Sequence, residues 1–177
     1  MVKGGPAKID GEYHNETDNF QPIKFKLNGI EFFSAENYFQ CMKTTSKEEF
    51  EKIRNSGCGM DVNLFLIFFF SNYIFFIFKV WSAGSRVNLR SDWEAVKVNV
   101  MYEGNKAKFD QHKDLAEKLM NTKGDVIFGG STSFWNKWNG LIMERIRAEL
   151  RDRDEEDKKT VERIKKMMEE YQKSQTK

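Results

Sequence analysis

Apolar and polar residues alternate between Ile23 and Phe33, on both sides of the dipeptide Asn28-Gly29. Asn-Gly accepts the positive φ angles of a type I′ turn, so this segment is predicted to be a β-hairpin. A second apolar stretch, residues 124–129, lies between two glycines and is predicted to be a short strand. Residues 1–20 are polar, contain Gly and Pro, and are predicted to form a flexible lead-in.

Elsewhere the apolar positions recur at helical spacing. Most of these stretches follow a capping signal, such as Ser34, the capping boxes that begin at Ser46 and Ser91, and the pair Ser131-Thr132. The predicted helices cover residues 35–44, 46–57, 91–101, 106–120, 134–150 and 151–177. The last of these is highly charged and repeats apolar residues from Val161 to Tyr171, which is typical of either a surface helix or a partner-facing helix.

The run from Val62 to Lys79, VNLFLIFFFSNYIFFIFK, differs from the polar chain around it. Extended to residue 81 it is almost long enough for a membrane-spanning helix, but Asn63, Ser71 and Asn72 interrupt it. A buried core helix would need apolar partners on all sides, and a domain of this size could hardly supply them. A membrane anchor and a core element therefore remain two interpretations of this run.

A third interpretation comes from the genetic code. Val codons begin with GT, a Lys codon can end in AG, and Phe, Ile, Asn and Tyr codons are rich in T and A. The run can therefore be written as a short T-rich stretch with the end marks of a spliceosomal intron translated in frame. We favour this retained intron, whose removal would join Asp61 directly to Val80.

Composition narrows the class of protein. The net charge is +2, from 29 basic and 27 acidic residues, which is no electrostatic footprint for bulk nucleic-acid binding. Two cysteines make no disulfide framework, and the N-terminus has no apolar signal-peptide core, so a cytoplasmic location is expected. With only two histidines a histidine-based metal site is not expected, and no cofactor is predicted.

Three clusters could carry chemistry. Glu36, Gln40 and Lys43 share one helix face at i, i+4 and i+7, which is also the pattern of a solvated face. In the second cluster, the Trp93 indole and the Lys97 ammonium share a side, close in sequence to Arg90.

An aromatic face with basic groups suits a base and its phosphates, although a core Trp with exposed cations fits equally. The third cluster runs from Gly129 to Gly140 and includes Ser131, Trp135 and Asn136. Glycines and hydroxyls before a helix can hold an anion, or simply cap the helix.

In order along the chain, these clusters resemble the NADAR, or YbiA-like, family from about Gly11 to Arg151, with the run Val62–Lys79 excluded. Residues 32–43 (FFSAENYFQCMK) and 90–101 (RSDWEAVKVNVM) carry the resemblance, supported by residues 108–112 and 141–150. It implies one compact, helix-rich α+β domain at residues 21–151, interrupted by 62–79, with a lead-in at 1–20 and a charged helix at 152–177. Family members look like N-glycosidases that act on early riboflavin intermediates or on ADP-ribosylated guanine.

The resemblance also implies roles for matching positions. Glu36 would be the catalytic carboxylate, and Lys43 could alternatively form a Schiff base with an opened ribose. Trp93 would stack on the substrate, and Arg90 and Lys97 would bind its phosphate. Where many members carry an Asp before the Phe-Trp of the third cluster, this chain has Thr132-Ser133.

The predicted function is hydrolysis of the base–ribose bond of a phosphoribosyl or ADP-ribosyl compound, without metal, cofactor or membrane. The expected partner is a small nucleotide-like substrate or an ADP-ribosylated base. The alternatives are an inactive module that binds ADP-ribose-like ligands, and a protein anchored in a membrane through residues 62–81.

Overall fold

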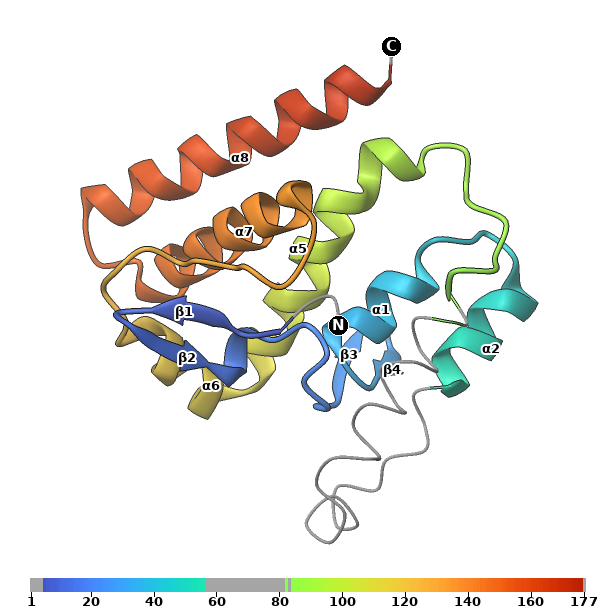
Figure 1. Ribbon diagram of the computed structural model, residues 1–177, viewed down its shortest axis with the longest axis horizontal. Helices are drawn as coiled ribbons and strands as arrows, with labels where there is room; N and C mark the ends of the chain where they lie inside the picture. The colour runs from blue at the N-terminus through green and yellow to red at the C-terminus, as the bar shows by residue number, and fades with distance from the viewer. Residues whose placement is uncertain (1–4, 57–81, 83, 177) are drawn as a thin grey trace, which may run out of the picture.

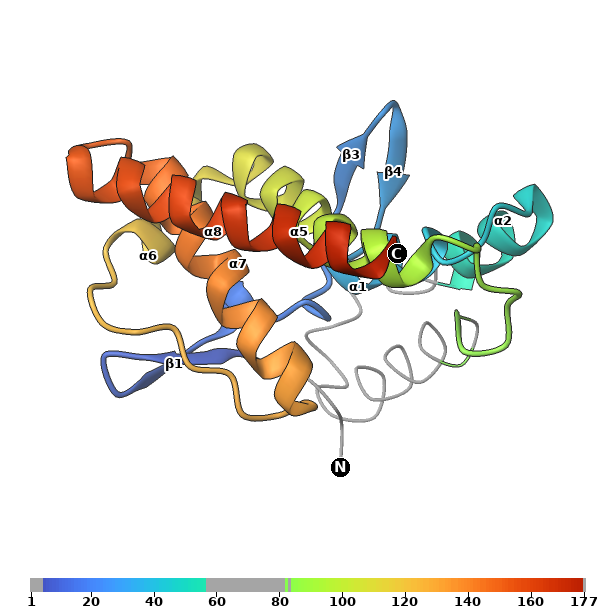
Figure 2. The same ribbon diagram turned by 90° about the horizontal axis from the view of Figure 1, so that it is seen from above.

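The computed structural model describes residues 5–56, 82 and 84–176. This part of the chain is mainly helical, with two small antiparallel hairpins that project in different directions from the helical body (Figures 1 and 2). The predicted class, a predominantly helical α+β fold, is confirmed. The helices are α1 (Ala35–Cys41), α2 (Lys47–Ser56), α5 (Trp93–Gln111), α6 (Lys113–Met120), α7 (Ser133–Arg151) and α8 (Glu155–Gln175), with a short 3₁₀ helix η1 (Asn15–Thr17).

The predicted hairpin at Asn28-Gly29 is confirmed by β3 (Phe25–Leu27) and β4 (Ile30–Phe32). Asn28 and Gly29 have φ angles of 51° and 78°, as a type I′ turn requires. Phe25 pairs with Phe32, and both side chains are buried. The hairpin therefore leads directly into α1 with its apolar end in the core.

The N-terminal segment corrects the predicted lead-in. Residues 7–14 form a hairpin of β1 (Ala7–Ile9) and β2 (Glu12–His14). Successive side chains of a strand point to opposite faces, so Ala7 and Ile9 lie on the same face of β1. Both side chains are buried in the core. The strand predicted at residues 124–129 is reduced to one antiparallel bridge, between Lys8 and Ile127.

Side-chain caps fix several helix starts. Ser34 accepts a hydrogen bond from Asn37 N, Ser46 from Glu49 N, and Thr132 from Trp135 N. The capping box predicted at Ser91 is absent: α5 begins at Trp93, and Asp92 makes no side-chain cap. The Asp92 carboxylate binds the Arg90 guanidinium instead, so the local ion pair replaces the cap.

Helix α5 is one continuous helix, whereas the sequence pattern predicted two helices with a break before Lys106. Gly104 lies inside it because α1 packs closely there: a Cβ on Gly104 would lie 2.7 Å from Cδ1 of Tyr38. This glycine marks a helix–helix contact, and α5 continues to Gln111, with His112 as its C-cap.

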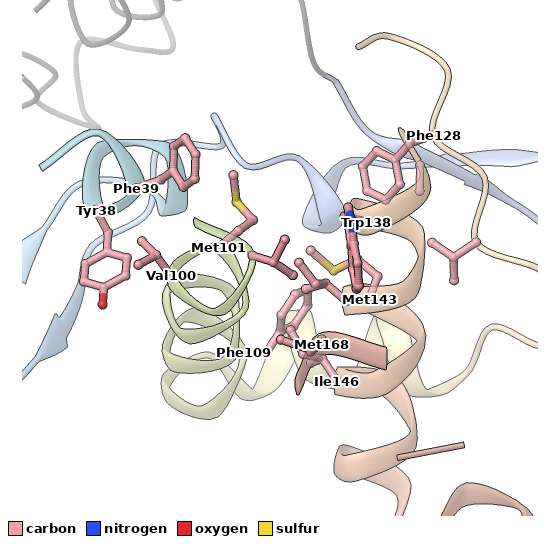
Figure 3. Packing of buried hydrophobic residues seen from close by; sticks show 14 of the residues in the cluster. Tyr38, Phe39, Val100, Met101, Phe109, Phe128, Trp138, Met143, Ile146 and Met168 are labelled. Atoms are coloured by element: carbon pink, nitrogen blue, oxygen red, sulfur yellow. The ribbon is translucent and has the colours of Figure 1, made fainter. Parts of the chain in front are cut away.

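The core lies where α5, α7 and α8 meet. Figure 3 shows Tyr38 and Phe39 beside Val100 and Met101 of α5, with Phe109, Met143 and Met168 deeper between the helices. Helix α8 lies along α7 and α5 (Figure 2), and buries Ile164 and Met168. The charged C-terminal helix is thus a packed part of the core as well as a surface.

No helix in the described part of the chain is long and apolar enough to cross a membrane. The run Val62–Lys79, on which the anchor and intron interpretations depend, lies outside the described residues.

Candidate active site

Helix α1 carries the buried acid of the site. Glu36 is the second residue of α1 and only 6% exposed. Burial raises the pKa of its carboxyl group, and the Asp18 charge raises it further, whereas a hydrogen bond from Gln40 and the Lys43 charge lower it. Desolvation is the largest of these effects, so the site favours the protonated acid.

Gln40 holds this carboxyl group. Its Nε2 donates to Oε1 of Glu36 at 2.6 Å, and Gln40 itself is 2% exposed. Within the described residues Oε1 of Gln40 has no hydrogen-bond partner. A protonated Glu36 carries an O–H, which is the type of donor that this oxygen lacks.

Lys43 follows the end of α1 and completes the face that the i, i+4, i+7 spacing predicted. Its Nζ lies 5.5 Å from the ring centroid of Phe39 and 6.0 Å from that of Trp93. Burial lowers the pKa of the Lys43 ammonium, and the Glu36 charge partly offsets this. The spacing predicted Lys97 as the cation beside Trp93, but the structure brings Lys43 to this ring.

Aromatic rings form one continuous wall beside these groups. The Phe39 centroid lies 5.0 Å from Trp93 and 5.2 Å from Trp135, which in turn is 5.1 Å from Phe134. Trp93 is buried and Trp135 is half-buried. The structure therefore brings both predicted Trp residues to the Phe39 side of α1.

The two predicted phosphate-binding cations are engaged in ion pairs. Arg90 makes two hydrogen bonds to the Asp92 carboxylate, at 2.5 and 2.9 Å, which raise the pKa of its guanidinium. Its backbone N–H donates to the Lys43 carbonyl, which places Arg90 next to the site. Lys97 pairs with Glu94 at 2.5 Å and lies 4.3 Å from the Phe134 ring centroid. A phosphate would have to compete with both carboxylates.

The third cluster contributes a rigid loop. Ser131 N donates to Oδ1 of Asn136, and Nδ2 of Asn136 donates back to the Ser131 carbonyl. Together with the Thr132 cap, these bonds fix the start of α7. The Asn136 amide group therefore binds backbone, which is a structural use of a predicted ligand-binding residue.

Several polar residues near Glu36 were not among the predicted site residues. Asn19 accepts a hydrogen bond from Glu36 N through its carbonyl oxygen and, through its side chain, contacts Asn105 and Asn139. Asp18 and Lys108 are buried beside them. Helical spacing does not reveal buried polar residues, but the polar pair Asp18-Asn19 before Phe20 was a possible signal.

A cavity of about 600 Å³ lies away from this site, between α8, α7 and the loop after α6. In its wall, Arg147 donates to the Gly124 carbonyl of that loop, and Arg151 donates to the carbonyl of Met120, the last residue of α6. The remaining charges of the wall are mixed in sign. These arginines anchor the loop. A buried acid, an amine and aromatic rings meet at Glu36 instead, which makes that region the candidate site. No group of three or more His, Cys, Asp or Glu side chains that could hold a metal occurs within the described residues.

The structure combines a helix-rich fold with a Glu-Gln-Lys face on and after α1 and an adjoining aromatic wall. Comparison with known proteins identifies the family to which this chain belongs. Residues 9–151 match the NADAR domain, and the chain belongs to this family. It is 27% identical to the N-glycosidase YbiA of Escherichia coli K12 over 148 residues, which cover 77% of this chain and 82% of that protein. It is 26% identical to the N-glycosidase YbiA of Shigella flexneri serotype 5b, with the same coverage.

Two further comparisons extend this picture. The NMR structure of E. coli YbiA matches with a TM-score of 0.58 and 22% identity, covering 77% of each chain, which supports the fold. The chain is also 31% identical to the chloroplastic riboflavin biosynthesis protein PYRR of Zea mays in an alignment of 72 residues, which covers 35% of this chain and 12% of that protein.

Proposed function

We propose that the protein is an N-glycoside hydrolase that cleaves the bond between a base and ribose in a phosphoribosyl or ADP-ribosyl compound. The observation that carries this proposal is the buried Glu36 acid, held by Gln40 and flanked by Lys43 and an aromatic wall. The N-glycosidase names of the YbiA relatives support the reaction class. The name of the maize relative favours a riboflavin-pathway intermediate among the candidate substrates.

In the proposed reaction, protonated Glu36 donates its proton to the leaving nitrogen as the C1′–N bond breaks. Water adds to C1′ and returns a proton to the Glu36 carboxylate, so the acid is regenerated. The carboxylate formed in this way lies beside developing oxocarbenium charge and stabilises it. A raised pKa suits this cycle, because the acid must be protonated near neutral pH before it can act.

Lys43 offers a second route through the same site. Its lowered pKa increases the fraction of free amine, which can attack C1 of an opened ribose to form a Schiff base. As the Schiff base forms, a proton passes from the lysine nitrogen to the base nitrogen, the C1–N bond to the base breaks, and the free base leaves. Water then hydrolyses the lysine adduct and releases the sugar and the free amine. Borohydride treatment during turnover tests this route, because reduction would leave a stable ribosyl adduct on Lys43 that peptide mass spectrometry detects. Absence of the adduct during active turnover would exclude it.

The rings of Trp93 and Trp135 are proposed to stack on the substrate, and Arg90 and Lys97 to bind its phosphate after exchange with Asp92 and Glu94. Ser131 and Asn136 are proposed to shape the loop beside the aromatic wall. No metal or cofactor is part of the proposal, and the proposed location is the cytoplasm.

The test is release of free base, followed by chromatography, from a phosphoribosyl pyrimidine and from ADP-ribosylated guanine. The full chain should release base from one of them, and Glu36→Gln should not. Binding of ADP-ribose by the unmutated chain without any turnover would support an inactive binding module instead. The Thr132 hydroxyl favours this alternative, because it caps α7 where many family members place an acid.

A further inference from the structure

Lys108 on α5 is a fully buried cation, with an exposed fraction of 0%. Its Nζ donates to the backbone carbonyls of Glu16 at 2.8 Å and of Asp18 at 3.2 Å. Burying an ammonium group is costly unless hydrogen bonds compensate, and here both of these partners are in one short loop. Lys108 therefore ties the loop of residues 16–19 to the central helix.

Asn105 lies one turn earlier on the same face of α5 and holds the end of this loop. Its Nδ2 donates to Oδ1 of Asn19 at 2.9 Å, and it is 0% exposed. Nδ2 of Asn19 in turn donates to Oδ1 of Asn139 on α7 at 3.3 Å. Side chains from two long helices thus converge on the short segment that runs from η1 to Asn19.

The loop is in turn bonded to the residue that carries the acid. The carbonyl oxygen of Asn19 accepts a hydrogen bond from Glu36 N at 2.8 Å. The first four N–H groups of a helix have no partner within the helix. This bond supplies a partner for one of them in α1, the N–H of Glu36 itself. A shift of the loop would move the backbone of Glu36 and the negative charge of Asp18 beside it.

We propose that Lys108 and Asn105 are positioning residues for Glu36, acting through the loop 16–19. The catalytic part of this inference rests on the proposed function, because Glu36 is the reacting acid only in that proposal. The network of hydrogen bonds from Lys108 and Asn105 would hold this acid in its reactive orientation. Misplacing a catalytic group by about 1 Å can cost about 100-fold in rate. The hydrogen bonds that hold the loop 16–19 can therefore affect catalysis although they do not touch the substrate.

The test compares full-length Lys108→Met and Asn105→Ala with two controls. Lys106→Met removes a lysine from the same helix whose partner, Asp110, lies on the surface. Ile164→Ala removes buried packing on α8 and lowers global stability without touching the network. All proteins are compared under conditions where each is fully folded by circular dichroism.

Two measurements do not depend on activity: hydrogen exchange of the Glu36 amide, and the pKa of its carboxyl group by NMR titration. We expect Lys108→Met and Asn105→Ala to accelerate this exchange at least about 10-fold more than Ile164→Ala and to shift the Glu36 pKa, and Lys106→Met to change neither. In active protein, kcat should fall at least about 10-fold while the Kd of a substrate analogue stays within about 3-fold.

Unchanged exchange or an unchanged Glu36 pKa in both network variants would overturn the positioning role. So would a fall in kcat that Ile164→Ala reproduces at equal stability. If the unmutated chain releases no base from any substrate while exchange and pKa respond as expected, the hydrolase proposal fails and the positioning of Glu36 stands.

Discussion

Gln40 donates a 2.6 Å hydrogen bond from Nε2 to Oε1 of Glu36, and both side chains are buried on one face of α1. This pair gives the carboxyl group a fixed orientation in a site where burial raises its pKa. A buried acid with these properties costs folding stability at neutral pH, because ionising it there is unfavourable. The cost is a property expected of a functional residue and can be measured.

Glu36→Gln should therefore stabilise the protein at pH 7, by on the order of 1 kcal/mol. The raised pKa means that Glu36 contributes its full stability below its unfolded pKa and loses it as pH rises through the folded pKa. The difference between variant and parent should shrink towards pH 4. Urea unfolding at several pH values measures it, and equal stability of the two proteins at pH 7 would contradict a buried, unfavourably ionised Glu36.

The Gln40–Glu36 pair is confined by Gly84. A Cβ on Gly84 would lie 1.9 Å from Oε1 and 2.8 Å from Cβ of Gln40, a clash that requires movement of the backbone or of Gln40. Gly84→Ala should destabilise the protein by about 1–3 kcal/mol and lower kcat by displacing Gln40. Gly129→Ala is the matched control, because a Cβ there meets nothing within 4 Å. Equal activity and stability of the two variants would contradict this close contact.

The contribution of the buried Lys108 to the stability of the protein should depend on pH in the alkaline range. Burial lowers the pKa of its ammonium group to about 8, below the value of 10.5 for an unburied lysine. Between these values this lysine binds a proton in the unfolded chain but not in the folded one, so the contribution of Lys108 to stability should rise with pH, by on the order of 1 kcal/mol per pH unit. Lys108→Met should remove this slope between pH 8 and 10 in denaturant titrations, and Lys106→Met should keep it. An unchanged slope in Lys108→Met would show that the rise has another source.

Local chemistry was predictable from sequence wherever neighbouring residues determine it. The Asn28-Gly29 turn, the Ser34 cap and the i, i+4, i+7 face of α1 are examples. Long-range packing was not predictable in this way. The sequence pattern predicted separate helices at residues 91–101 and 106–120, but α5 runs unbroken through this region, and Gly104 within it contacts Tyr38 of α1. A lysine is normally exposed, so nothing in the pattern indicated that Lys108 is buried, and its partners are about ninety residues away along the chain.

The run Val62–Lys79 lies between Glu36 and Trp93, which the fold brings to one site. If it is a retained intron, a form in which Asp61 is followed by Val80 should be more soluble and at least as active. Size-exclusion chromatography and base release from both forms test this expectation. A spliced transcript that keeps these codons would contradict the intron, and wholly soluble full-length protein would contradict the membrane anchor.

Glu36 is proposed to be the acid of an N-glycosidase. The most direct measurement is kcat for base release by the full chain, by Glu36→Gln and by Lys106→Met, together with the Kd of each protein for ADP-ribose or ribose 5-phosphate. Loss of a general acid should lower kcat by about 10²–10⁴-fold in Glu36→Gln while Kd changes little, and Lys106→Met should match the parent. Base release by Glu36→Gln at the parent rate would contradict the claim.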